Sequence, residues 1–402
     1  MAPRAKRQRP VDYTEDASDD ICQPATQLQK DRWNGFCEIE SEPALFNVML
    51  REFGVKGVRV QEVVSLDEEM MAFLNKPIYG LIFLFRWRED DAEKQEASCP
   101  DGIWFANQTA SNACASVALL NIVNNIPDID LGENLHHFKE FTMPFTPALR
   151  GDAINNFEFV KRVHNSFARK MDILNCDLQL KNEASSRKRS KGQVSDESDS
   201  SFHFIAFVPA MGQVWKLDGL ERQPQALGEY SGDDWLELAK PNIVDCMAAY
   251  EEDQIEFSIL GVVQDPLPHL IQQLAANVRG LEILNQHLMP HLDQNTAPPK
   301  SIIYDTVLGP DASLGLTRAD IDQAVLPDHL LAVDPTVSVA ALQQHQQALA
   351  RAQGELRVRI REEQQAQRAD DDHATGRRYD YGPAVRTWLQ FLARKQKLAE
   401  LL

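Results

Sequence analysis

Cysteine is scarce in this sequence, and no cysteines are paired into short motifs. The 402 residues include six cysteines, and no two of them form a C-x-x-C pair. Structural zinc sites and small disulfide-bonded domains usually carry cysteines at such repeated spacings. The sequence therefore predicts neither kind of site, and it indicates a protein of a reducing compartment that needs no metal or organic cofactor.

Positive charge and long apolar runs are also lacking. A net charge of −19 argues against general nucleic-acid binding and favours a partner with a basic surface. The longest apolar run, Ile78 to Phe85, is far shorter than the roughly 20 residues of a membrane-spanning helix. The basic N-terminus precedes no apolar segment, so we expect no secretory signal. Its cluster at residues 4–9 is either a nuclear import signal or a solvated tail, and we expect a cytoplasmic and nuclear protein.

What the sequence does contain is an apolar helix that begins near a cysteine. Residues 115–123 are apolar almost all round, which predicts a helix buried on every side. With Asn112 or Ser111 as N-cap, Cys114 falls in the first turn, where free amides and the helix dipole favour a thiolate. Gln108, six residues upstream, offers a side-chain amide as an oxyanion donor. A lone cysteine is more often a small buried hydrophobe, so a nucleophile needs partners elsewhere.

Those partners are predicted in a β-hairpin. Residues 202–208 and 214–218 alternate with period two around a turn that we predict at 209–212. This turn places His203 directly opposite Asp218, with Cβ atoms roughly 5 Å apart. A carboxylate that holds an imidazole orients a general base, although a purely structural pair stays open from these two residues alone. Together with the cysteine and the glutamine above, the set provides nucleophile, base, orienting group and oxyanion donor.

Other elements follow from local patterns. Residues 1–32 are polar and charged, and we expect a disordered tail with basic and acidic segments. Residues 181–201 have almost nothing apolar and predict a long mobile loop within a domain. The remaining patterns predict helices at residues 43–53, 131–145 and 152–168, and strands at 58–63, 81–85 and 103–105.

The last third of the chain is predicted to be helical. Leucines from Leu267 to Leu288 step by three and four residues, a coiled-coil-like seam in which Asn277 would set the register. A final helix carries apolar residues at 385, 388, 389 and 392. These helices are either an ordinary amphipathic hairpin or a surface that binds a partner, and the pattern leaves both open.

The motifs taken together resemble the ubiquitin C-terminal hydrolases. The resemblance rests on Gln108, on residues 112–115 around the cysteine, on Phe202-His203-Phe204 and on residues 217–220. It implies a knotted α/β fold with the papain-like cysteine protease arrangement and no cofactor. It also implies hydrolysis of ester, thioester, amide or isopeptide bonds to the C-terminal glycine of ubiquitin, with Cys114, His203, Asp218 and Gln108 as catalytic residues.

The resemblance also divides the chain. It covers residues 33–262 as the catalytic domain, with a crossover loop at about 165–201 whose length is similar to that of members accepting bulky ubiquitin adducts. Residues 263–402 resemble the helical regulatory extension of the proteasome-associated and chromatin-associated long members. Besides ubiquitin and its conjugates, the implied partner is a proteasome subunit, with a chromatin adaptor as second choice.

Two other functions compete with this interpretation. Another Cys–His–Asp enzyme, such as an arylamine acetyltransferase, uses the same residue order. An inactive ubiquitin-binding scaffold in a proteasome or chromatin complex would share the fold without the chemistry. Labelling by a ubiquitin vinyl-type probe and a Cys114→Ala comparison separate these alternatives.

Overall fold

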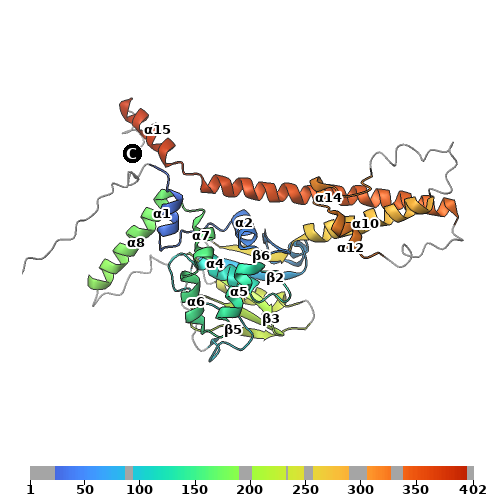
Figure 1. The fold of residues 1–402 in the computed structure, drawn as a ribbon. Coiled ribbons are helices and arrows are strands. Elements are labelled where there is room, and N and C mark those ends of the chain that lie inside the picture. Colours follow the sequence, from blue (N-terminus) through green and yellow to red (C-terminus); the bar gives the residue numbers. More distant parts are fainter. Residues whose placement is uncertain are drawn as a thin grey trace, which may run out of the picture.

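The fold combines a β-sheet wrapped by helices with a helical extension (Figure 1). The computed structural model describes residues 23–86, 94–189, 202–231, 234–248, 257–288, 306–326 and 338–395. None of the helices within these ranges is long and apolar enough to cross a membrane. The predicted α/β class is confirmed.

The sheet has six strands in the order β1-β6-β2-β3-β4-β5. Every neighbouring pair is antiparallel. The strand order also places β2 beside β3 and β6, two strands that are far from it in the sequence. β6 lies between β1 and β2, which places the strand that precedes the extension inside the sheet. The strands are β1 Val58–Glu62, β2 Ile78–Arg86, β3 Phe202–Ala210, β4 Gln213–Leu217, β5 Gln225–Glu229 and β6 Ser258–Gln264.

Both faces of this sheet are covered, which explains the continuous apolar strands. Along β3, Phe204 and Ala206 enter one core, whereas Ile205 and Phe207 enter the other. An uninterrupted apolar run is what a strand buried on both faces requires. The first core contains residues of α2 Pro43–Phe53, α4 Cys114–Val123, α5 Gly132–Thr142, α6 Pro147–Asn155 and α7 Glu158–Asn165, and the second contains residues of α3 Glu68–Met71 and α9 Leu236–Ala248.

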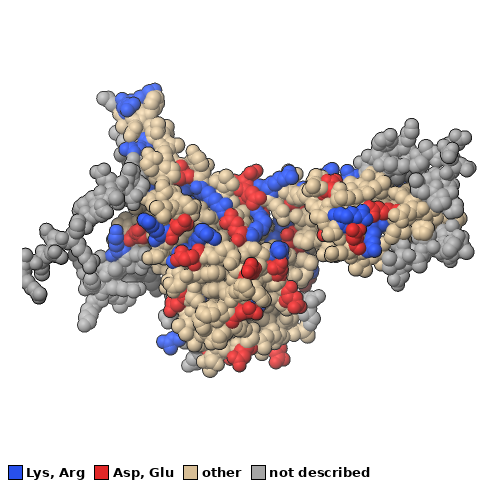
Figure 2. Space-filling model, viewed as in Figure 1, with Lys and Arg blue, Asp and Glu red and all other residues tan. Residues whose placement is uncertain are grey.

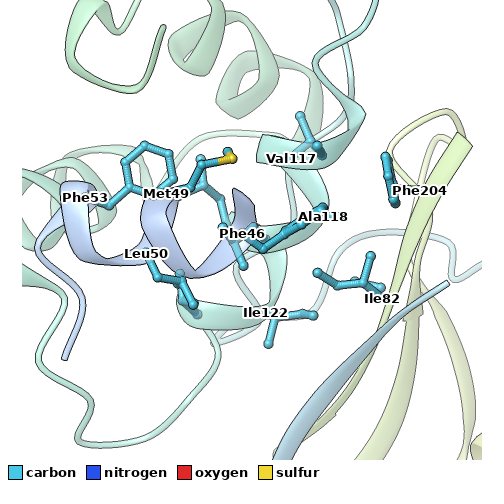
Figure 3. Packing of buried hydrophobic residues seen from close by; sticks show 14 of the residues in the cluster. Phe46, Met49, Leu50, Phe53, Ile82, Val117, Ala118, Ile122 and Phe204 are labelled. Atoms are coloured by element: carbon cyan, nitrogen blue, oxygen red, sulfur yellow. The ribbon is translucent and has the colours of Figure 1, made fainter. Parts of the chain in front are cut away.

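Helix α4 lies at the centre of the first core, as its apolar sequence predicts. Figure 3 shows Val117, Ala118 and Ile122 of α4 between α2 and the strand residues Ile82 and Phe204. Every residue of α4 after Cys114 is buried. The helix is therefore fixed on all sides, and only its first residue is partly accessible.

The predicted strand at residues 103–105 is wrong, because this segment pairs with side chains instead of another strand. The Trp104 amide donates to Asn125 Oδ1 at 2.9 Å, and Asn125 Nδ2 donates back to the Trp104 carbonyl at 2.8 Å. The Ala106 amide donates to Asn121 Oδ1 at 2.9 Å. Asparagines on or just after α4 thus satisfy backbone groups that a sheet would otherwise satisfy.

Three predicted boundaries also differ from the structure. The expected disordered tail ends early, since α1 Gln27–Arg32 begins at Thr26 with a capping box. The expected crossover loop contains α8 Lys170–Arg189, a helix with three leucines, three lysines and two arginines, all residue types that favour the helix. Residues 190–201 lie outside the described residues. The predicted helix 152–168 is divided between α6 and α7 by a break at residues 156–157.

The extension is built on an antiparallel pair, α10 Pro266–Leu288 and α14 Val339–Arg378, as the leucine seam predicts. Leu274 shares a cluster with Ile360, whereas Leu288 shares one with Leu342, so the two helices run in opposite directions. Asn277 accepts a hydrogen bond from Gln353 at 3.1 Å inside this interface. Shorter elements complete the extension: η4 Ala312–Leu314, α12 Arg318–Gln323 and α15 Gly382–Arg394.

The end of α14 lies on the part of the molecule that the sequence predicts to be the catalytic domain, called the catalytic part below, and the sequence did not predict this contact. Ion pairs join Arg59 to Glu363 at 2.5 Å and Arg378 to Glu52 at 2.7 Å. Figure 2 shows the resulting mixture of basic and acidic side chains along the crossing. Helix α14 therefore reaches back over α2 and ends near the start of α8.

Candidate active site

Cys114 is the first residue of α4, which confirms its predicted place in the first turn. The predicted N-cap is wrong: the cap is Ala113, and no side chain caps the helix. Asn112 instead has φ 60°, a left-handed conformation that asparagine tolerates. Its Nδ2 lies 3.1 Å from Cys176 Sγ on α8. The turn before the cysteine is therefore tied to the crossover segment.

His203 and Asp218 are brought together by the β3–β4 hairpin. His203 Nε2 lies 2.7 Å from Asp218 Oδ1, and both residues are buried, with 3% and 4% of their surface exposed. Asp218 Oδ1 also accepts from the Leu220 amide at 2.9 Å. The carboxylate is thus fixed by its own turn while it holds the imidazole.

The hairpin register differs from the prediction by two residues. Ala206 pairs with Leu217, so the turn is Met211-Gly212, whose φ values of 53° and 76° fit a two-residue hairpin turn. His203 therefore meets Asp218 diagonally, not as its direct cross-strand partner. A shift of two residues keeps every side chain on the same face of the sheet, and for this reason the predicted pair still forms.

The surroundings of His203 favour its protonated form. Burial lowers its pKa, but hydrogen bonds to Asp218 and to Cys114 outweigh burial and raise the pKa from 6.5 to about 9. His203 is therefore hydrogen-bonded to Cys114 as well as to Asp218. With Nε2 engaged by Asp218, the other ring nitrogen, Nδ1, is left for the Cys114 sulfur.

Gln108 lies in the segment that enters α4 and is anchored beside Asp218. Its backbone amide donates to the Gly219 carbonyl at 2.7 Å. A Cβ atom on Gly219 would lie 3.1 Å from both Gln108 N and Val117 Cγ1, so glycine lets this turn approach the loop and the first turn of α4 closely. Gln108 Oε1 is buried without a hydrogen-bond partner among the described residues. The fold therefore gathers all four predicted residues at one place.

A buried histidine behind α4 was missed by the sequence interpretation. His164 on α7 lies 2.7 Å from the Cys37 carbonyl through Nε2 and 2.8 Å from Ser116 Oγ through Nδ1. Burial lowers its pKa from 6.5 to about 4, so the ring is neutral. Nε2 then donates to the carbonyl and Nδ1 accepts from Ser116. Ser116, a polar residue inside a mostly apolar helix, was the sequence feature that could have indicated a buried polar partner.

Metal ligands are not assembled in this region. Among the described residues, no group of three or more His, Cys, Asp or Glu side chains is placed to hold a metal ion. The chemistry available to the site is that of a thiol, an imidazole, a carboxylate and nearby amide groups.

Comparison with known proteins agrees with this geometry. Residues 36–248 match the model of the family described as ubiquitin carboxyl-terminal hydrolase, family 1. The chain is 38% identical over 252 residues to ubiquitin carboxyl-terminal hydrolase isozyme L5 of Dictyostelium discoideum, and the alignment covers 62% of this chain and 68% of that protein. It is 38% identical over 247 residues to ubiquitin carboxyl-terminal hydrolase ubh-4 of Caenorhabditis elegans, covering 59% of this chain and 71% of that protein.

A solved structure is also similar in sequence. The Trichinella spiralis UCH37 catalytic domain bound to ubiquitin vinyl methyl ester is 34% identical, covers 57% of this chain and 96% of that chain, and has a TM-score of 0.46. The family match spans strands β1 to β5, α4 and the segment that enters it, and so includes all four site residues. The chain therefore belongs to the ubiquitin carboxyl-terminal hydrolase family 1 and is a cysteine-type hydrolase.

Proposed function

We propose that the protein hydrolyses ester, thioester, amide and isopeptide bonds to the C-terminal glycine of ubiquitin, with Cys114 as nucleophile. The observation that carries this proposal is the position of His203 between Cys114 and Asp218. An imidazole that is held by Asp218 and hydrogen-bonded to Cys114 is placed to take the thiol proton. The thiolate formed in this way attacks the glycine carbonyl.

The remaining groups have roles that follow from this attack. The His203 imidazolium gives its proton to the leaving amine, and the neutral ring then takes a proton from the water that hydrolyses the thioester. Asp218 keeps the ring oriented and stabilises its charge. The Cys114 backbone amide stabilises the oxyanion from the start of α4, where helix amides are unpaired. The Gln108 side-chain amide adds a second donor from the segment that enters α4.

Replacing the nucleophile tests the proposal. Cys114→Ala is expected to abolish hydrolysis of ubiquitin–fluorophore conjugates and labelling by ubiquitin vinyl methyl ester, while ubiquitin binding measured by calorimetry changes little. Cys246→Ala, which removes a partly exposed cysteine from the second core, is the matched control and should keep both activities. Full hydrolysis by Cys114→Ala would refute the catalytic assignment, and absence of both activities in the wild type would favour a ubiquitin-binding scaffold.

We also propose that the extension is a regulatory platform for a second protein, a proteasome subunit or, as second choice, a chromatin adaptor. No residue of α15 is buried, and Val385, Trp388 and Phe391 are each about half exposed. An apolar patch of this kind often marks an interface.

Contacts at the base of α15 support a route from this patch to the catalytic part. Asp380 Oδ2 accepts from the Lys170 amide at 3.0 Å, at the first residue of α8. Arg377 Nη1 donates to Asp172 Oδ2 at 3.0 Å and to the Phe167 carbonyl at 2.8 Å. A protein that moves α15 would therefore act directly on the start of the crossover helix, which contacts the turn before Cys114 through Cys176.

A further inference from the structure

Asn107, the residue before Gln108, joins two loops of the active site. Its Nδ2 lies 2.5 Å from the Glu221 carbonyl and 3.4 Å from the Gly219 carbonyl. Both partners are backbone oxygens, which only accept, so the side chain at this position must donate. One amide group thus connects the segment carrying the oxyanion donor to the turn that follows Asp218.

The opposite side of Asn107 is held against α6. Its backbone amide donates to the Pro147 carbonyl at 3.0 Å. A Cβ atom on Gly151 would lie only 2.1 Å from the Asn107 carbonyl oxygen, so α6 approaches this backbone as closely as glycine permits. Asn107 is therefore clamped between a helix on one side and the Asp218 turn on the other.

The segment before Asn107 depends on side chains for its position, because no strand pairs with it. The buried Arg150 guanidinium donates to the carbonyls of Ile103 and Phe105 at 3.0 and 3.2 Å. At the C-terminal end of this segment, the Asn107 side chain donates to the turn that follows Asp218. The Asn107 side chain is thus the contact next to Gln108 that joins this segment to the turn after Asp218.

We propose that Asn107 is a positioning residue that places Gln108 for oxyanion stabilisation, an inference that rests on the role proposed for Gln108. Oxyanion donors must lie about 2.7–3.1 Å from the developing negative charge. Without the Asn107 amide, the Gln108 amide–Gly219 carbonyl bond is the remaining backbone tether to the turn. The nucleophile is held independently, since Cys114 belongs to α4 and Asp218 accepts from the Leu220 amide.

The test compares two reactions of the same cysteine. Hydrolysis of a ubiquitin–fluorophore conjugate passes through an oxyanion, whereas alkylation of Cys114 by iodoacetamide is a displacement at carbon and forms none. Asn107→Ala is expected to lower kcat by about 10- to 100-fold, the cost of a displacement of roughly 1 Å, with little change in KM. The alkylation rate should stay within about twofold, because Cys114 and His203 are untouched.

Two further variants make the result decisive. Asn107→Asp keeps the size of the side chain but turns an acceptor toward two carbonyls, so it should lose at least as much kcat. Asn156→Ala removes an amide that donates to the Asp152 carbonyl at 2.7 Å at the far end of α6, and it should behave as wild type. An equal fall in hydrolysis and alkylation for Asn107→Ala would overturn the proposal, because Asn107 would then support the nucleophile or the fold.

A double variant separates this proposal from the function on which it rests. If Gln108 is an oxyanion donor, Gln108→Ala lowers kcat by about 100- to 1000-fold. Adding Asn107→Ala to Gln108→Ala should then cost little more, because Asn107 acts through Gln108. Fully multiplicative losses would overturn the positioning role alone. A normal kcat for Gln108→Ala would instead refute the proposed role of Gln108.

Discussion

The catalytic part and the helical extension are stabilised by different kinds of contact. In the catalytic part, buried polar side chains such as Arg150 and His164 fix irregular backbone within the first apolar core. In the extension, α10 and α14 share an apolar seam that includes a buried polar layer at Asn277 and Gln353. Its contacts with the catalytic part include ion pairs at the surface, such as Arg51 with Asp371.

This difference indicates where each part tolerates change. A buried polar group that loses its partner is costly, so the catalytic part should respond strongly to single substitutions. Partly exposed ion pairs contribute about 0–1 kcal/mol each, so those along the middle of α14 should be lost at small cost. The end of α14 is held more firmly, because Arg377 is largely buried and pairs with Glu40 and Asp172, and Ala374 lies in the first core. Regulation through the extension therefore requires a partner whose binding free energy exceeds the cost of breaking these contacts. Three substitutions test this comparison.

Asp218→Asn should have the largest effect, because it changes the buried His203–Asp218 pair of the catalytic part. The same change in a serine-protease triad lowers kcat by about 10⁴-fold, and we expect a comparable loss. It should also change the pH profile. The hydrogen bond to Asp218 raises the pKa of His203 to about 9, whereas burial lowers it. Removing the carboxylate therefore moves the alkaline limb of kcat/KM to lower pH.

The raised pKa of His203 also predicts how the stability of the fold changes with pH. Because folding raises the pKa of His203 above 6.5, its contribution to stability is fully present below pH 6.5 and is lost as pH rises through about 9. Melting temperatures measured across this range should show that loss in the wild type and much less of it in Asp218→Asn. Asp130→Asn, at a surface carboxylate paired with Lys56, is the control. An alkaline limb that does not move in Asp218→Asn would contradict the assignment.

Trp388→Ala should have an intermediate effect, confined to partner binding. If Trp388 is a central anchor, its loss costs roughly 2 kcal/mol or more of binding free energy. Basal hydrolysis of a ubiquitin–fluorophore conjugate and the melting temperature should stay unchanged, since 56% of the side chain is exposed. Affinity for proteasomes and for chromatin complexes is measured with full-length protein, and Phe141→Ala on α5, where 67% of the residue is exposed, is the control. Equal affinity for wild type and Trp388→Ala in both preparations would refute the platform.

Arg378→Ala should have the smallest effect on stability. Its guanidinium bonds to Glu52 and to Ser166 Oγ, each at 2.7 Å, and lies 4.6 Å from the centre of the Phe167 ring. We expect a loss of about 1 kcal/mol or less, with faster amide hydrogen exchange at the end of α14 and unchanged exchange in β3. Arg318→Ala, which removes ion pairs within the extension, is the control. A loss above about 3 kcal/mol would show that both parts unfold as one unit and would break the comparison.

The sequence by itself determined the elements whose pattern is local. The apolar run of α4 required burial on all sides, and the period of two in β3 and β4 required a hairpin. These patterns placed Cys114 in a first turn and His203 on the same face as Asp218 even though the turn was misplaced, because a shift of two residues preserves the face. The leucine seam likewise predicted that α10 pairs with another helix, and the structure shows this helix to be α14.

Only the tertiary structure decided features that depend on residues far apart in the chain. Asn121 and Asn125 replace a strand partner for residues 103–106, and no local pattern distinguishes such a segment from a strand. Ala113 became the cap of α4 because Asn112 is held by Cys176, 64 residues away. The docking of Arg377 on Asp172 spans 205 residues. Hydrogen bonds and ion pairs of this kind are set by the spatial arrangement of completed elements, which periodicity within one segment does not encode.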